Sequence, residues 1–123
     1  MTQQTMTAWV EIPVSDLEAS VVFYDGVFGW TSTIDNDMGP NPVAVFNNAM
    51  DAAGGQLYPG KPANGTGSTT HLTIAGTVEA AAERVVKLGG SMVGSVVEIP
   101  PGRFQYALDL DGNSIGLFEP KAA

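Results

Sequence analysis

The sequence predicts an α+β domain made of two βαβββ repeats, whose curved mixed sheets form a concave cup. Three observations predict this class. The order strand, capped helix, glycine and three strands occurs twice, a Gly/Pro-rich stretch separates the two runs, and Asp16-Leu17-Glu18-Ala19 is echoed by Thr77-Val78-Glu79-Ala80. The 123 residues fit a single domain over 1–123, with repeat one at 6–59, a linker at 60–68 and repeat two at 69–120.

The first repeat is predicted to open with a strand over residues 8–14, followed by a helix. Alternation along this strand separates an aliphatic face, which we expect to pack against the helix, from a mixed face. Asp16 has the side chain of a helix N-cap, and Gly29 ends the helix because glycine readily adopts a positive φ. The helix residues expected to face the core are Leu17, Val21, Tyr24 and Phe28, with Phe23 and Val27 beside them.

The remaining elements follow the same order in both repeats. In repeat one we expect strands at 30–34, 43–46 and 52–58. In repeat two we expect strands at 70–75, 92–97, 104–110 and 114–118, and a helix that Thr77 caps and Gly89-Gly90 ends. Asp109 and Asp111 suggest a calcium site, but an Asp-Gly hairpin turn explains them without an ion. One helix covers only one face of a sheet, so the opposite faces must curve into a cup or meet a partner.

Composition excludes several classes of function. The formal charge is −8, and the 5 basic residues are scattered, so we expect no nucleic-acid partner and no anionic membrane partner. Without cysteine there is no disulfide, thiolate zinc site or cysteine nucleophile. Residues 1–7 lack the pattern of a signal peptide, and no apolar stretch is long enough to span a bilayer. We therefore expect a cytoplasmic protein.

The mixed strand faces are where a site is expected. Glu11 lies on this face in repeat one, and His71, the sole histidine, lies on it in repeat two. We expect Glu11 to face away from solvent, where burial would raise its pKa and suit a general base, with His71 as a polarising donor or second acid–base group. Structural hydrogen bonding remains the alternative for both. Other expected ligand contacts are Trp9, Tyr58, Thr73 and Phe118, with core or dimer packing as the alternative for the three aromatic residues.

The order of elements and several motifs resemble the glyoxalase/bleomycin-resistance/extradiol-dioxygenase superfamily, whose members are also called vicinal-oxygen-chelate proteins. The matching motifs are Glu11 to Leu17, Phe23-Tyr24, Phe28-Gly29-Trp30, Thr70-His71-Leu72, Leu88-Gly89-Gly90 and Asp109 to Phe118. The resemblance implies a glyoxalase-like fold, a small organic ligand in the cup, and a homodimer that completes the cups. It is specific for the fold and not for the reaction, since this fold hosts lyases, isomerases, dioxygenases, thiol transferases and drug-sequestering proteins.

Metal-dependent members of the superfamily carry His or Glu ligands on the first and last strand of each repeat. Those positions fall here on Trp9, Gln56, His71 and Gly116. Tryptophan and glycine side chains cannot ligate, and the Gln56 amide is a weak ligand that we expect to contact substrate instead. We therefore expect no resident metal and no other cofactor.

Three functions remain open. The first is a small-molecule-binding protein that could act as a metal-independent lyase or isomerase through Glu11 and His71. The second is a non-catalytic protein that sequesters a drug or metabolite. The third is a metal-dependent lyase or dioxygenase that uses His71, Glu11 and a further ligand.

Overall fold

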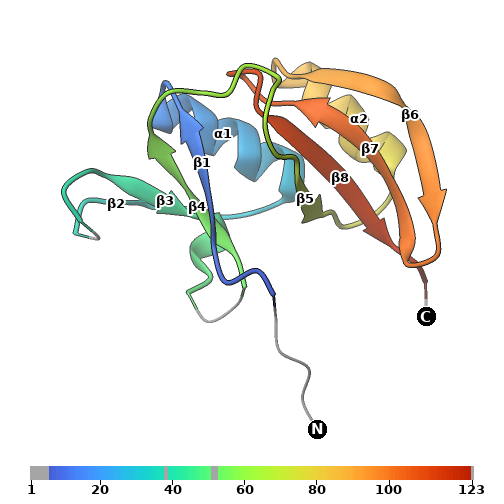
Figure 1. Cartoon of the computed structure of the whole chain (residues 1–123), viewed down its shortest axis with the longest axis horizontal. Helices are drawn as coiled ribbons and strands as arrows, with labels where there is room; N and C mark the ends of the chain where they lie inside the picture. The colour runs from blue at the N-terminus through green and yellow to red at the C-terminus, as the bar shows by residue number, and fades with distance from the viewer. Residues whose placement is uncertain (1–5, 38, 51–52, 123) are drawn as a thin grey trace, which may run out of the picture.

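A computed structural model describes residues 6–37, 39–50 and 53–122 and shows the predicted repeat of elements (Figure 1). The first half contains β1 (Val10–Val14), α1 (Leu17–Phe28), β2 (Ile34–Asp35), β3 (Val43–Val45), a 3-10 turn at Phe46–Asn48, and β4 (Gly55–Pro59). The second half contains β5 (Thr70–Thr73), α2 (Val78–Lys87), β6 (Ser91–Ile99), β7 (Gly102–Leu108) and β8 (Ser114–Pro120). The predicted α+β class and the two βαβββ units are confirmed.

The two sheets have the same topology. The strand order is β1-β4-β3-β2 in the first sheet and β5-β8-β7-β6 in the second. In each sheet the first and last strands of the half pair in parallel, and the other pairs are antiparallel. The parallel pairs also share a register, because Glu11 lies opposite Gln56 as His71 lies opposite Gly116.

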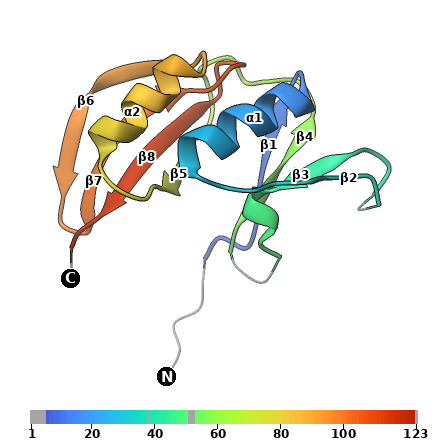
Figure 2. The same ribbon diagram turned by 180° about the vertical axis from the view of Figure 1, so that it is seen from behind.

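Both helices cover the same side of the molecule, and Figure 2 shows them together in front of the two sheets. They pack against each other, and the Arg84 guanidinium Nε donates to the Val27 carbonyl at 2.9 Å. The opposite sheet faces carry no helix (Figure 1). Neither helix in the described part of the chain is long and apolar enough to cross a membrane.

One buried apolar cluster contains residues from both halves. The aliphatic face of β1 is buried as predicted, and so are most of the predicted core positions of α1. Val21 is only partly buried, whereas Ser20, which was not predicted, is fully buried. At the end of α1, the Trp30 ring stacks between Phe28 and Phe46 with centroid separations of 4.9 Å on each side.

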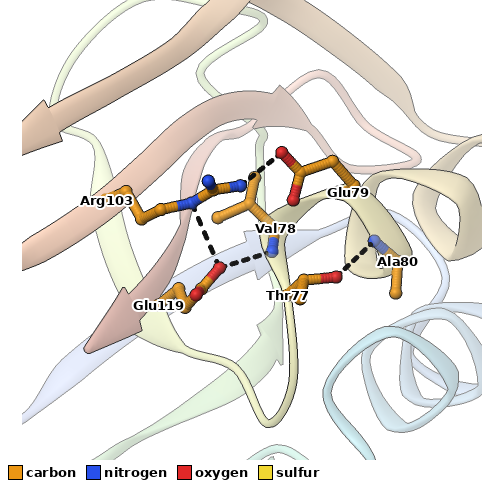
Figure 3. Close-up of polar contacts among 6 residues, drawn as sticks. All are labelled: Thr77, Val78, Glu79, Ala80, Arg103 and Glu119. Atoms are coloured by element: carbon orange, nitrogen blue, oxygen red, sulfur yellow. Dashed lines mark hydrogen bonds and ion pairs between the residues drawn. The ribbon is translucent and has the colours of Figure 1, made fainter. Parts of the chain in front are cut away.

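The two helix starts are capped as predicted. The Asp16 carboxylate accepts from the Ala19 amide, and the Thr77 hydroxyl accepts from the Ala80 amide, each at 3.1 Å. The start of α2 has a second acceptor, because the Glu119 carboxylate at the end of β8 accepts from the Val78 amide at 2.9 Å (Figure 3). Figure 3 also shows Arg103, which forms ion pairs with Glu119 and Glu79 and so ties β7 to α2.

The predicted second strand at 30–34 is wrong, because β2 covers only Ile34–Asp35. The Asn47 side chain accepts from the Thr31 amide at 2.8 Å, and the Asn48 side chain accepts from the Thr33 amide at 2.9 Å. These side chains take the amides that a strand ladder would otherwise use.

Several predicted strand boundaries shift by a few residues. The first strand starts at Val10, the fifth ends at Thr73, β7 covers Gly102–Leu108, and β6 and β8 are longer than expected. The fourth starts at Gly55, and the predicted start at residue 52 lies outside the described residues, as do residues 1–5 of the predicted polar N-terminus.

The predicted Asp-Gly turn between β7 and β8 joins the two halves. Asp109 is buried and accepts from the Tyr24 hydroxyl of α1 at 2.7 Å, as well as from the Asp111 and Asn113 amides at 2.9 Å. The Asn113 side-chain amide donates to Asp109 and to the Pro13 carbonyl of β1. Burial, reinforced by the Asp109 charge, raises the pKa of Tyr24 well above its usual value, so its hydroxyl keeps its proton.

Candidate functional site

A cleft of about 940 Å³ lies between the first strands of the two halves. Residues 9–13 around β1 line one side, and residues 68–72 around β5 line the other. Asn113 also lines the cleft, and its bond to Pro13 holds the second half against the first at that point. The position of the cleft therefore depends on the same turn that joins the halves.

Glu11 lies on the mixed face of β1 and lines this cleft, as the alternation predicted. The Gln56 side-chain amide on β4 donates to the Glu11 carboxylate at 3.0 Å, across the parallel strand pair. Glu11 is nevertheless exposed, so the expectation that it faces away from solvent is wrong. The carboxylate is oriented by one neighbour and remains open to a ligand.

His71 also lines the cleft, from the equivalent position on β5. Its ring meets Phe104 of β7 edge to face, with centroids 4.8 Å apart and planes at 85°. The Tyr106 ring centroid lies 5.7 Å from that of His71 and 5.2 Å from that of Phe104, so the three rings form one cluster. The imidazole is thus part of an aromatic surface on the face of the second sheet that no helix covers.

The other predicted contacts divide into three groups. Trp9 is half-buried and lines the cleft, and Gln56 orients Glu11. Phe118 lines a smaller hollow of about 290 Å³ that it shares with His71, Ile99 and Phe104. Tyr58 and Thr73 line neither cavity.

Sequence reasoning missed several lining residues. Phe46 reaches the cleft from the 3-10 turn, in which Asn47 and Asn48 have positive φ values, and this asparagine pair was a turn signal that could have been used. Phe104, which lines the smaller hollow, and Tyr106, whose ring lies beside His71, were assigned to a strand but not to a site. Their period-two spacing, which puts both side chains on one face, was the signal that could have found them.

The metal ligands of the resembled superfamily do not fit this site. Trp9, the expected first ligand position, offers no ligand atom, and Glu11 lies opposite Gln56 in the first sheet as His71 lies opposite Gly116 in the second. Gly116 offers no ligand, and a Cβ built on it would lie 2.1 Å from the His71 ring Nδ1 atom. Among the residues that the structure describes, no group of three or more His, Cys, Asp or Glu side chains is arranged to hold a metal ion.

The cleft is weakly acidic. Glu11 and His71 are the titratable side chains among its described lining residues, and neither lysine nor arginine is present in that lining. Aromatic walls, one carboxylate and one imidazole suit a small organic molecule that combines an apolar part with hydrogen-bonding groups.

Comparison of the sequence with known proteins gives one family model and two curated relatives that resemble this chain. A family model described as "Bleomycin resistance protein-like N-terminal" matches residues 7–44. CFP32, a protein provisionally named as a glyoxylase in Mycobacterium tuberculosis and Mycobacterium bovis, is 26% identical over 115 residues, which is 90% of this chain. The chain spans only 44% of the length of these curated relatives.

Solved structures share the fold. A member of the glyoxalase/bleomycin resistance protein/dioxygenase superfamily from Sphaerobacter thermophilus has a TM-score of 0.64 and 22% identity, and covers 94% of this chain and 98% of its own. TnmS3, an antibiotic-binding protein from Streptomyces sp. CB03234, has a TM-score of 0.61 and 24% identity, and covers 98% of this chain and 100% of its own.

Proposed function

We propose that this chain is a member of the glyoxalase/bleomycin-resistance/dioxygenase superfamily and that it binds a small organic molecule in the cleft between β1 and β5. The observation that carries this proposal is the cleft itself, whose volume of about 940 Å³ lies within the range of small-molecule sites. The name of TnmS3, an antibiotic-binding protein with the same fold, supports a role in holding a drug or metabolite without chemistry.

Trp9 gives a direct test of binding, because it is one of two tryptophans and lines the cleft. Trp30 is packed between Phe28 and Phe46. A panel of antibiotics and metabolites would be titrated against Trp30→Phe, which reports on Trp9 alone, and against the control Trp9→Phe. We expect saturable quenching in the first variant and not in the second. Equal quenching in both variants, or none across the panel, would contradict the proposal.

A second candidate function is acid–base catalysis without a metal. The observation that favours it is that a carboxylate and an imidazole, Glu11 and His71, line one cleft from equivalent strands. The reaction that we have in mind is an isomerisation. Glu11 accepts a proton from the carbon next to a ligand carbonyl group, while His71 donates a hydrogen bond to the carbonyl oxygen. If the ligand is a β,γ-unsaturated carbonyl compound, return of the proton from Glu11 to the γ carbon completes the reaction and moves the double bond into conjugation with the carbonyl group. Turnover of a bound ligand, followed by mass spectrometry and NMR, separates this candidate from sequestration.

We further propose that the protein works without a stoichiometric divalent metal. The support is the lack of fit described above, with glycine at one superfamily ligand position and an amide at another. Elemental analysis after purification without chelators measures this directly. One tightly held zinc, nickel, manganese or iron ion per chain would favour the metal-dependent alternative instead.

A homodimer is the assembly that we propose. Four apolar side chains on the uncovered face of the second sheet are substantially exposed: Val93 (42%), Val97 (40%), Ile99 (38%) and Tyr106 (38%). Burial of such a face against a second copy removes apolar surface from water. Sedimentation at micromolar concentration should give twice the mass of the chain, and a strictly monomeric species would count against the proposal.

A further inference from the structure

The position opposite His71 on β8 is filled by a glycine, and the absence of a side chain there has a steric consequence. A Cβ added to Gly116 would lie 2.1 Å from His71 Nδ1, 2.5 Å from Cε1 and 2.8 Å from Cγ. The imidazole therefore occupies the space that a side chain at residue 116 would need. Gly116 is buried and its φ is not in the left-handed region, so an alanine there would be hindered by the His71 ring and not by backbone strain.

This arrangement holds the His71 ring against the second sheet. With the His71 ring in the space above Gly116, its centroid lies 4.8 Å from that of Phe104 and 5.7 Å from that of Tyr106. In this position the ring forms the wall common to the large cleft and to the smaller hollow beside Ile99, Phe104 and Phe118. Because His71 lines both cavities, a ring displaced from Gly116 would change the shape of their common wall.

We propose that Gly116 is a positioning residue for His71 and thereby determines the shape of the ligand site. The effect of Gly116 on ligand binding rests on the proposed function. Its effect on the position of the His71 ring does not, because that position can be measured without a ligand. Any larger residue at 116 would push the imidazole off the sheet, away from Phe104, and narrow the cleft or the hollow. The expected ligand carries a planar apolar group that packs beside the His71 ring.

The sole histidine makes the ring position measurable. In the wild-type protein, the His71 ring protons should be shifted by the ring currents of Phe104 and Tyr106, and Phe104→Leu should reduce that shift. Gly116→Ala should move the same resonances toward their positions in the denatured chain. Histidine resonances that are unchanged in Gly116→Ala would overturn the proposal.

A double-mutant cycle separates positioning from a general effect on folding. Gly116→Ala should lower the unfolding midpoint in the wild-type background but change it little in the His71→Ala background, because the obstructing ring is then absent. The double variant keeps the test decisive even if Gly116→Ala alone fails to fold. Equal losses in both backgrounds would mean that Gly116 does not act through His71.

Binding of Nile red, a neutral planar dye, tests the consequence for the site. Its affinity should fall at least fivefold in Gly116→Ala, and His71→Ala and the double variant should have equal affinities. An unchanged affinity in Gly116→Ala would contradict the role of Gly116 in shaping the site. The wild-type protein and all variants could fail to bind Nile red while the His71 resonances and the double-mutant cycle behave as expected. That result would support the positioning role of Gly116 and count against the proposed binding function.

Discussion

The two halves of this chain share one topology but hold the key side chain of their first strand in different ways. In the first half, Glu11 lies opposite Gln56 and is oriented by a hydrogen bond of 3.0 Å. In the second half, His71 lies opposite Gly116 and is oriented by the space that the glycine leaves. Pairing of the first and last strands of each half determines where the side chain of Glu11 or His71 lies. The residue opposite it, Gln56 or Gly116, determines how that side chain is oriented.

The sheets differ in a related way. In the first sheet β2 and β3 are short, and the Asn47 and Asn48 side chains accept from backbone amides of the segment before β2. The second sheet has long strands and a register shift in β6, where Gln105 donates to the Gly94 carbonyl at 2.8 Å. Bulged strands bend and twist more strongly, which helps the second sheet to curve around its aromatic face. The first half therefore supplies the oriented carboxylate, and the second supplies most of the apolar surface.

The largest loss of folding stability is expected from Asp109→Ala, which removes a hydrogen bond between the two halves. Asp109→Ala leaves the Tyr24 hydroxyl and two backbone amides without their acceptor, so the free energy of unfolding should fall by at least about 3 kcal/mol. Asp111→Ala is the matched control, because the Asp111 carboxylate accepts from the exposed Ser15 at the surface and its loss should cost about 1 kcal/mol or less. Urea unfolding measures both, and equal losses would show that the buried Asp109 carboxylate joins the halves no more strongly than the exposed Asp111 carboxylate.

An intermediate effect is expected from Tyr24, whose hydroxyl crosses between the halves. Tyr24→Phe should cost about 2 kcal/mol near neutral pH through loss of the bond to Asp109. The raised pKa of Tyr24 stabilises the folded state fully below the ordinary tyrosine pKa of about 10, and this contribution is lost as pH rises above it.

Urea midpoints measured at pH 8 and pH 10.5 test this pH dependence. The wild-type protein and Tyr106→Phe, which removes an exposed hydroxyl, should both lose stability more steeply than Tyr24→Phe. If the Tyr24→Phe midpoint fell as steeply as that of the wild type, Tyr24 would not be the titrating group.

The smallest expected losses of stability come from removing the N-cap side chains of the two helices, and they should differ between α1 and α2. Asp16→Ala removes the only side-chain acceptor that we find at the start of α1 in the described residues and should cost about 1 kcal/mol. Thr77→Ala should cost less, because Glu119 still accepts from the Val78 amide of α2. Thr77→Ser keeps the hydroxyl and serves as the control. Thermal unfolding of the three variants ranks them, and a larger loss in Thr77→Ala would reverse the comparison.

Local sequence signals were sufficient for most of the fold. The caps at Asp16 and Thr77, the stop at Gly29 and the turn at Asp111-Gly112 are each specified by a few neighbouring residues, and the structure confirms them. Alternation along β1 and β5 also placed Glu11 and His71 on the open face. These features were predictable because their physical cause lies within a few residues of chain.

Features that depend on distant residues were not predictable. The strand expected at 30–34 was lost to asparagine side chains more than ten residues away. The exposure of Glu11 depends on how far apart the two sheets lie, which no local pattern encodes. The role of Gly116 depends on the observed register of β5 with β8, because only that register puts the His71 ring above it.

Glu11 is the charged group that we expect to contact a ligand in the cleft between β1 and β5. The direct measurement is the affinity of Glu11→Gln, in the Trp30→Phe background, for the first ligand found to quench Trp9, with an unfolding curve for the same variant. Glu83→Gln, an exposed change on α2 away from the cleft, is the control. We predict that Glu11→Gln loses at least tenfold in affinity with an unchanged unfolding midpoint, while Glu83→Gln loses neither. An unchanged affinity, or a loss of stability of about 1–3 kcal/mol that marks Glu11 as structural, would contradict the account.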